Sequence, residues 1–316
     1  MTGLLETTAE RRARRNRHPA SDERPAWMGR QPRWATAARG GLLTVACLAV
    51  IVPFVAVVMT SLAPQRDISA RGGLVLFTSE PSLAAYRAVL SGGVVTRALS
   101  VSVAVTAVGT VLSLACTIML AYALSRPGSL LHKPILLMTL FTLLFNPGMI
   151  PMYLIVKQLG LIDNLAALIL PVVVNAFNVI VMRSFFLELP GELTESAKID
   201  GAGELRILTS IVLPLSKAVV AVVGLFYAVA YWNAFFSALL YLPSPEKWPL
   251  QLVLRTFVVN QTPLGTDELS ASTESLPPQA SIQMAILVMS VIPILIIYPF
   301  IQKHFSKGLL IGAVKG

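Results

Sequence analysis

The sequence carries unusually little charge. Of its 316 residues, 13% are charged and 55% are hydrophobic, and the mean hydropathy is +0.72. A soluble domain carries about 25% charged residues. A chain this apolar has too few charges to cover a surface in water, so a soluble globular protein is excluded and a membrane protein is indicated.

Cysteine and histidine are also scarce. The two cysteines, Cys47 and Cys116, both lie in long apolar runs, where two thiols predict neither a disulfide framework nor a metal site. The three histidines, His18, His132 and His304, are scattered along the chain without other ligand-type residues beside them. We therefore expect no metal ion bound to this chain.

Catalytic and nucleotide-binding motifs are missing. The sequence contains no GxxxxGK[ST] loop to hold phosphates, and "GAG" at 201–203 lacks both a preceding strand and a third glycine. No Ser/His/Asp or Cys/His set is visible, so we expect no catalytic residue. Acidic residues deep in the apolar runs, which ion-coupled transporters use as relays, are absent as well. If the chain transports a solute, the work must come from elsewhere.

What the sequence does contain is six long runs without Asp, Glu, Lys or Arg. They cover residues 40–65, 98–125, 134–156, 164–182, 218–245 and 275–302. Each is at least as long as the ~18 apolar residues that mark a spanning helix. We therefore expect an all-α, polytopic membrane protein with six transmembrane helices. The expected spans are about 40–63, 98–123, 134–156, 164–183, 208–236 and 281–302.

Residues 1–39 form an Arg-rich tail. They hold nine Arg, no Lys and four acidic residues, and the run "RRARRNR" at 11–17 is predicted to be disordered. Because Lys and Arg mark the cytoplasmic side, the tail places the N-terminus inside the cell. With six spans, residues 303–316 are then cytoplasmic too, and residues 242–280 form a long external loop. A nucleic-acid-binding arm is the alternative; we favour the orienting tail and expect no nucleic-acid partner.

Neutral polar residues remain inside the predicted spans. Three amides are predicted near mid-membrane, and three aromatic residues in the outer half of the fifth span. These six are Asn146, Asn175, Asn178, Tyr227, Tyr231 and Trp232. Amides hydrogen-bond hydroxyl groups and rings stack on the apolar face of a sugar, so the six are candidates for the pathway of a neutral polyhydroxylated solute. The alternative is structural, because amides link helices and Tyr and Trp form the interfacial belt.

A polar elbow, residues 190–207, separates the fourth and fifth spans. Six charged residues lie between 192 and 206, and placing them in mid-bilayer would cost on the order of 15–20 kcal/mol, so the elbow lies outside the lipid. The stretch "ELTESAKID" predicts a short helix, on which Ser196 and Ala197 form a small-residue face toward a partner. Gly201 permits a sharp bend, and "AGELRILTSIVLPL" predicts a second helix that leads rigidly into the fifth span.

The elbow resembles the "EAA" loop of ABC-importer membrane subunits, in which EAA is followed by three residues, Gly, nine residues and I-x-LP. The residues at matching positions are Glu195, Ala197, Gly201, Ile211, Leu213 and Pro214, whereas Ser196 departs from the usual Ala. "GLLIGAVKG" at 308–316 resembles the terminus of MalG-like subunits of maltose-type permeases. "WPLQLVLR" and "YPFIQKHFSKG" resemble the LplC-like branch of this carbohydrate group.

This resemblance implies the type I, MetI-like permease core over residues 40–316, in a bacterial cell membrane. Its implied partners are a second homologous permease subunit, two cytoplasmic ABC ATPases that bind ATP and Mg, and an extracellular or periplasmic solute-binding protein. The chain itself would be a transport subunit without a cofactor and not an enzyme. By position, the family's ATPase-coupling role falls on Glu195, Ser196, Ala197, Asp200, Gly201, Val314, Lys315 and Gly316.

In such an importer, ATP binding closes the ATPases, the elbows move together, and the permease pair switches from inward- to outward-facing. A carbohydrate is the implied cargo. Importers of another neutral solute are the nearest alternative. An ion-coupled secondary transporter would work without partners, and a membrane-bound enzyme or scaffold would be active without any ATPase.

Overall fold

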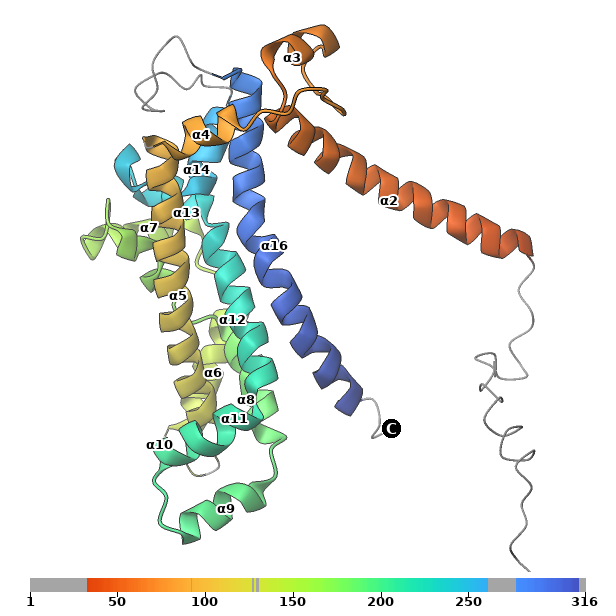
Figure 1. The fold of residues 1–316 in the computed structure, drawn as a ribbon. Helices are drawn as coiled ribbons and strands as arrows, with labels where there is room; N and C mark the ends of the chain where they lie inside the picture. The colour runs from red at the N-terminus through yellow and green to blue at the C-terminus, as the bar shows by residue number, and fades with distance from the viewer. Residues whose placement is uncertain (1–32, 92, 127, 129–130, 261–276, 313–316) are drawn as a thin grey trace, which may run out of the picture. The chain divides into compact units, whose positions relative to one another are not determined.

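The computed structural model describes the backbone of residues 33–91, 93–126, 128, 131–260 and 277–312, and side chains between residues 34 and 299 of these. Within these ranges every regular element is helical, which confirms the all-α prediction (Figure 1). Residues 1–53 and 54–316 form separate compact units. Most of the Arg-rich tail, part of the predicted external loop and the predicted ATPase contacts Val314, Lys315 and Gly316 lie outside the described residues.

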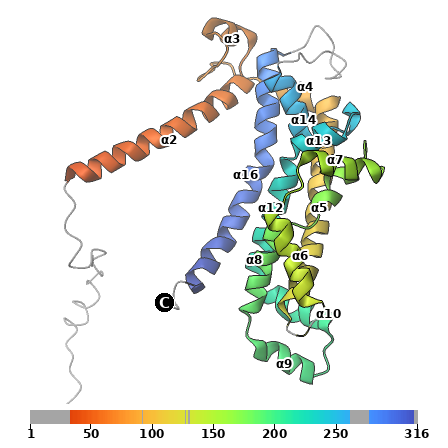
Figure 2. The same ribbon diagram turned by 180° about the vertical axis from the view of Figure 1, so that it is seen from behind.

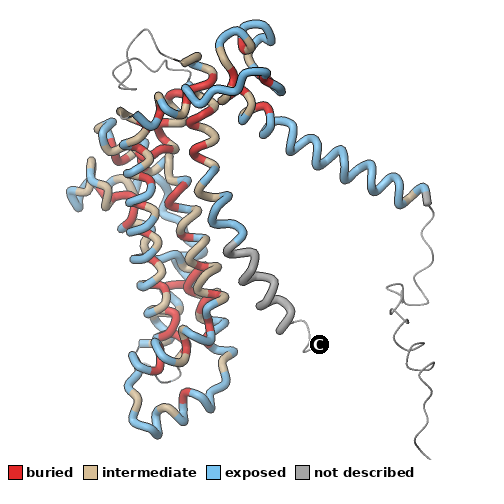
Figure 3. The backbone as a smooth tube through the Cα atoms, viewed as in Figure 1, coloured by how far each residue is buried: buried red, intermediate tan, exposed pale blue. Residues whose placement is uncertain are grey.

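Helix α2 (Arg33–Ser61) begins in the first unit and contains the predicted first span up to Ser61. Its residues 34–61 have a mean hydropathy of 2.9. Most of its length is exposed (Figure 3), including large apolar residues such as Leu42, Val50 and Ile51. A helix with apolar side chains exposed along most of its length is suited to contact with lipid or with another membrane subunit.

Helix α5 (Val94–Ser125) is the longest helix inside the second unit apart from α16 (Gln279–Gly312). Its 32 residues extend over about 48 Å. It ends at Ser125 because Arg126 precedes Pro127, and a residue before proline disfavours the helical conformation. Helix α5 contains the whole predicted second span, and α16 contains the whole predicted sixth span.

The third predicted span, 134–156, is broken. It consists of α6 (His132–Leu144) and α7 (Met149–Gln158), separated by residues 145–148. Pro147 cannot donate a backbone hydrogen bond, and Gly148 has a φ of +86° that only glycine adopts readily. The two residues together end one helix and start another, so the charge-free run does not give one continuous helix.

The fourth span is bent. Two short 3₁₀ turns, η1 (Leu165–Leu168) and η2 (Leu170–Val172), precede α8 (Ala176–Leu187), with an angle of 50° between the two parts. Pro171 lies inside η2, and Asn175 caps α8 by accepting a hydrogen bond from the amide of Asn178 over 3.2 Å.

The segment of the predicted fifth span, 208–236, is bent more sharply. The segment α10 (Glu204–Ile207), η3 (Leu208–Val212) and α11 (Leu213–Leu215) meets α12 (Lys217–Trp232) at an angle of 87°. Proline at 214 removes a backbone donor, the turn before it widens into the π-helix η3, and the chain turns at Ser216. A straight helix therefore begins at Lys217. By length and composition, three described helices can cross a membrane, or up to five if each bent pair is one span.

The core of the second unit lies between α5, α8 and α12. It includes Val105 and Leu124 of α5, Met182 of α8 and Val223 of α12. A second cluster joins the end of α12 to α4 (Ala84–Leu90), α14 (Leu250–Leu254) and α16. Both views of the ribbon place α9 (Gly191–Ile199) and α10 at one end of this unit and α4, α13 (Phe235–Tyr241) and α14 at the other (Figures 1 and 2).

Candidate functional site

The bend of the elbow is present where the sequence predicts it. Gly201 follows α9 with a φ of +79°. The amide of Ala202 donates to the carbonyl of Ala197 over 2.9 Å, and the amide of Gly201 donates to the carbonyl of Lys198 over 3.0 Å. These two bonds form a Schellman motif, which favours glycine because other residues resist a positive φ. Backbone hydrogen bonds therefore close the bend, and it is not a loose hinge.

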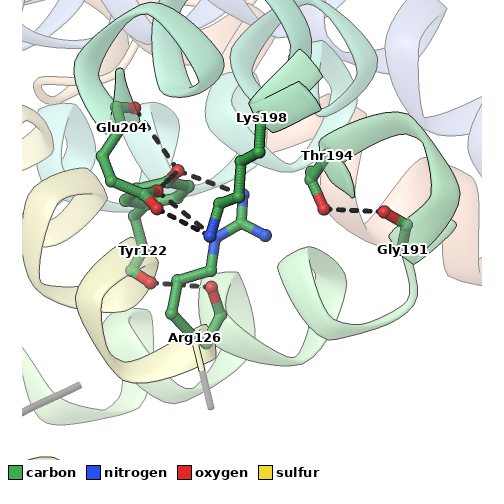
Figure 4. Close-up of polar contacts among 7 residues, drawn as sticks. Tyr122, Arg126, Gly191, Thr194, Lys198 and Glu204 are labelled. Atoms are coloured by element: carbon green, nitrogen blue, oxygen red, sulfur yellow. Dashed lines mark hydrogen bonds and ion pairs between the residues drawn. The ribbon is translucent and has the colours of Figure 1, made fainter. Parts of the chain in front are cut away.

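A cluster of four polar side chains joins the elbow to the end of α5 (Figure 4). The hydroxyl of Tyr122 donates to Oε2 of Glu204 over 2.5 Å, and Nζ of Lys198 lies 2.9 Å from Oε1 of the same carboxylate. The guanidinium of Arg126 donates to the Tyr122 hydroxyl over 3.0 Å and lies over its ring. Glu204 therefore connects α9 and α10 to α5.

The electrostatics of this cluster keep Glu204 ionised. The hydrogen bond from Tyr122, and next to it the bond from Lys198, hold the pKa of the Glu204 carboxyl below its ordinary value. A depressed folded-state pKa means that the stabilisation is present above the ordinary pKa of glutamate and is lost as the pH falls through the lowered value. The bonds of Glu204 to Tyr122 and Lys198 are therefore fully formed at neutral pH.

Helix α9 turns one side toward its own chain and leaves the other exposed. Thr194 is buried, and its hydroxyl donates to the carbonyl of Gly191 over 2.8 Å. Ala197 is partly buried and packs with Ala202 against the main core. Ser196 remains exposed. The small residue at 197 permits close packing within the chain.

The outer surface of the elbow combines carboxylates with apolar side chains. Ile199 is 87% exposed, Leu205 74% and Leu193 43%. Glu195 and Asp200 are exposed as well. Large apolar side chains this exposed, rimmed by polar residues, are typical of a surface that binds another protein. Sequence reasoning missed Ile199 and Leu205 because their spacing alone does not show which side of the short helices faces outward.

A cavity of about 340 Å³ separates α9 from the ends of α5 and α8. Residues that line it include Tyr122, Arg126, Phe186, Thr194, Glu195 and Lys198. Tyr122, Arg126 and Lys198 of the polar cluster line it, so the cavity lies beside the junction of the elbow with α5.

Four of the six predicted pathway residues meet at a second hollow, a cleft of about 660 Å³. Asn175, Asn178, Tyr227 and Tyr231 all line it. Sequence reasoning missed the aromatic residues beside them, since Phe177, Phe226 and Phe236 resemble lipid-facing residues in an apolar run. Their rings are 52%, 41% and 50% exposed. This open cleft, bordered by rings and amides, has the chemistry for stacking on a sugar ring and bonding its hydroxyl groups.

The two tyrosines of the cleft also fasten α12 to α5. The Tyr231 hydroxyl lies 2.7 Å from Oγ of Ser113, and the Tyr227 hydroxyl lies 2.7 Å from Oγ1 of Thr117. Tyr227 and Tyr231 are 3% and 4% exposed. Their hydroxyl groups are engaged within the unit, which supports the structural alternative for these two residues.

Asn146 and Trp232 do not belong to the cleft lining. Oδ1 of Asn146 accepts a hydrogen bond from the amide of Gly148 over 2.9 Å and shapes the turn between α6 and α7. Trp232 is buried in the second cluster, and its Nε1 donates to the carbonyl of Ser290 over 2.8 Å. Both residues therefore lie outside this cleft, and their pathway role stays a prediction.

One rim of the cleft is held by an ion pair. Nζ of Lys247 lies 2.6 Å from Oδ2 of Asp163, and the hydroxyl of Ser244 donates to the same oxygen over 2.9 Å. The amide of Asp163 donates to the carbonyl of Tyr241 over 2.7 Å. Asp163 precedes η1 and Tyr241 ends α13, so these contacts join two elements that contribute residues to the cleft. The bond from Lys247 lowers the pKa of Asp163.

Comparison with known proteins identifies close relatives. The model of the family "Binding-protein-dependent transport system inner membrane component" matches residues 113–311. "Polygalacturonan/rhamnogalacturonan transport system permease protein YtcP" of Bacillus subtilis (strain 168) is 44% identical over 276 residues, covering 87% of this chain and 96% of that protein. "Protein LplC" of the same organism is 44% identical over 268 residues, covering 84% and 90%.

A solved structure shows the same fold. It is described as a bacterial ABC transporter involved in the import of the acidic polysaccharide alginate. The likeness has a TM-score of 0.81 and 31% sequence identity, and it covers 88% of this chain and 99% of the matching chain. The fold thus extends well beyond the residues of the family model.

Proposed function

The chain belongs to the family of binding-protein-dependent transport system inner membrane components, and we propose that it is a permease subunit of an ATP-driven carbohydrate importer. The family makes it a multi-pass membrane protein and a transport subunit, not an enzyme. The names of similar proteins support a carbohydrate cargo: one transports polygalacturonan or rhamnogalacturonan, and another complex imports alginate.

The cleft supports the same cargo class. Its exposed phenylalanine rings offer surfaces for the apolar faces of sugar rings, and the exposed Asn175 and Asn233 offer amides for hydroxyl groups. The cleft lies between η1, α8, α12 and α13. Of these, α8 and α12 each belong to one of the two bent pairs of helices described above. A substrate path along broken helices is physically reasonable, because the freed backbone groups line a hollow and avoid lipid.

The single observation that carries the proposal is the elbow, whose bend is closed by backbone hydrogen bonds. Its outer surface is exposed and partly apolar, while its inner side is fixed to α5 through Glu204 and Tyr122. We propose that this outer surface docks on a cytoplasmic ATPase, with Glu195 and Asp200 at its polar rim. Closure of the ATPases would displace α9. The bend at Gly201 and the bond between Glu204 and Tyr122 would transmit this displacement to α5 and α12. The permease would then switch from inward- to outward-facing.

The proposed assembly contains a second homologous permease, two ATPases that hold ATP and Mg, and an external solute-binding protein. The exposed apolar surface of α2 suits contact with lipid or with the second permease. In this assembly the elbow end of the second unit faces the cytoplasm, together with both termini of the chain.

Reconstitution with these partners tests the proposal. Glu195→Lys and Gly201→Pro should each abolish the stimulation of ATP hydrolysis by the loaded binding protein, or detach the ATPase. Proline at 201 cannot adopt the positive φ and removes the amide that bonds Lys198. Unchanged stimulation in both variants would refute the coupling role of the elbow.

A further inference from the structure

The described lining of the cleft contains no charged side chain. Every described residue that lines it is apolar, aromatic, an amide or a hydroxyl residue, without a charged side chain. Such a lining suits a neutral sugar. A sugar acid carries a carboxylate, and moving an anion out of water without a counter-charge is costly. An acidic saccharide in this cleft therefore needs a cation at its edge.

Arg255 provides a cation beside the cleft. It begins η5 (Arg255–Val259), is exposed, and its guanidinium carbon lies 5.1 Å from the ring centre of Phe235, a residue of the cleft lining. Stacking on an aromatic ring orients the planar guanidinium and leaves its N–H edge available to a carboxylate.

Two other cations of the second unit, Arg66 and Lys247, are already paired. Arg66 forms an ion pair with Glu80, and Lys247 forms one with Asp163. Within the part of the chain that the structure describes, Arg255 has a ring contact but no carboxylate partner. The guanidinium of Arg255 can therefore donate hydrogen bonds to the carboxylate of a ligand.

We propose that Arg255 is a specificity-determining residue that recognises the carboxylate of an acidic saccharide at the edge of the cleft, while the exposed rings stack on its sugar units. This inference rests on the proposed carbohydrate-import function and adds the substrate class, a uronate-containing oligosaccharide. A guanidinium–carboxylate contact is charge-assisted, so it discriminates between an acid and its methyl ester, which differs by one methyl group and carries no charge.

Direct binding to the assembled transporter tests the assignment. The complex of both permeases and the ATPases, in lipid nanodiscs and without the binding protein, is titrated with trigalacturonate and with its methyl ester. We expect wild type to bind the acid more tightly than the ester, and Arg255→Gln to weaken acid binding about tenfold or more, with ester binding unchanged. Arg255→Lys should keep part of the preference, since the charge remains.

Two comparisons separate recognition from a packing role of Arg255. Added salt should weaken acid binding by wild type and not by Arg255→Gln, because screening acts on the charge pair. Arg71→Gln is the matched control: Arg71 is an exposed arginine of α3 (Gln65–Arg71), an element that contributes nothing to the cleft. It should leave both affinities as in wild type.

Three results would overturn the inference: no preference of wild type for the acid, no binding of either probe, or an equal loss for acid and ester in Arg255→Gln. The equal loss would assign Arg255 to the packing of η5 against α13. Failure of the proposed function is read separately, as the absence of binding-protein-stimulated ATP hydrolysis in the wild-type complex. A complex that shows this stimulation but no acid preference refutes the role of Arg255 alone.

Discussion

The hydroxyl of Tyr122, in the last turn of α5, donates a 2.5 Å hydrogen bond to Glu204, the first residue of α10. The same carboxylate binds Lys198 in the last turn of α9. Three helices of the second unit thus meet at one side chain. In the proposed importer, this junction is where a displacement of the elbow enters the membrane-spanning helices.

Removal of the Tyr122 hydroxyl should loosen the junction without creating a cavity. We expect Tyr122→Phe to lower the stability of the purified complex by about 1 kcal/mol, the usual net contribution of one hydrogen bond. Solute uptake per ATP hydrolysed should fall as well, because the elbow then moves more independently of α5. Uptake and hydrolysis measured in the same proteoliposomes give this ratio. Tyr298→Phe, at an exposed tyrosine of α16, is the control; an unchanged ratio in Tyr122→Phe would contradict the role of the junction.

The bend at Gly201 allows a test of backbone conformation alone. A Cβ atom built at Gly201 or at Gly203 meets no atom within 4 Å, but Gly201 has a φ of +79° and Gly203 a φ of −70°. We expect Gly201→Ala to cost about 1 kcal/mol and to reduce stimulated ATP hydrolysis, whereas Gly203→Ala should be close to neutral. Thermal unfolding and the hydrolysis assay check this. Equal behaviour of the two variants would mean that the left-handed bend is not required.

The contact between α5 and α12 depends on Gly109. A Cβ atom there would lie 2.8 Å from the ring of Tyr231, which is closer than Cβ atoms approach other atoms in folded proteins. Gly109→Ala should therefore destabilise the complex by about 1–3 kcal/mol through overpacking. Gly224→Ala is the matched control, since its Cβ would meet Leu114 at an ordinary 3.5 Å. A melting temperature unchanged by Gly109→Ala would show that the two helices separate easily.

The exposed apolar residues of the elbow should matter for assembly and not for folding. Because Ile199 is 87% exposed, Ile199→Asp should leave the melting temperature of the isolated subunit nearly unchanged. It should reduce co-purification of the ATPase, because the proposed interface would then bury a charge. Leu74→Asp, at a 60% exposed leucine outside the elbow, serves as the control. If both variants retained the ATPase equally, the apolar surface of the elbow would have no docking role.

The sequence predicted elements whose signal is local. Low charge and long charge-free runs predicted the membrane-spanning helices, and the conformational freedom of Gly201 predicted the bend. The breaks within the third to fifth spans were harder to predict. The composition of a run does not show whether residues such as Gly148 or Pro214 end a helix or only bend it.

Contacts between distant residues were beyond local patterns. Tyr122 and Glu204 are 82 positions apart, and Tyr231 and Ser113 are 118 positions apart. The sequence supplied Tyr231 as a pathway residue, and the structure shows that its hydroxyl joins two helices. The packing of Trp232 in the second cluster was also beyond local patterns, because an aromatic residue near the end of a span resembles a belt or a binding residue until its packing partners are known.

Chemical cross-linking tests the central claim, that α9 lies against the ATPase, most directly. With Cys47 and Cys116 replaced by alanine, Ser196→Cys places a single exposed thiol on α9. A short bifunctional reagent should join this thiol to the ATPase in the assembled complex, with a yield that changes when ATP is bound. Ser82→Cys, at an exposed serine outside the elbow, should give no such product. Equal yields from the two positions, or none from Ser196→Cys in an active complex, would contradict the account.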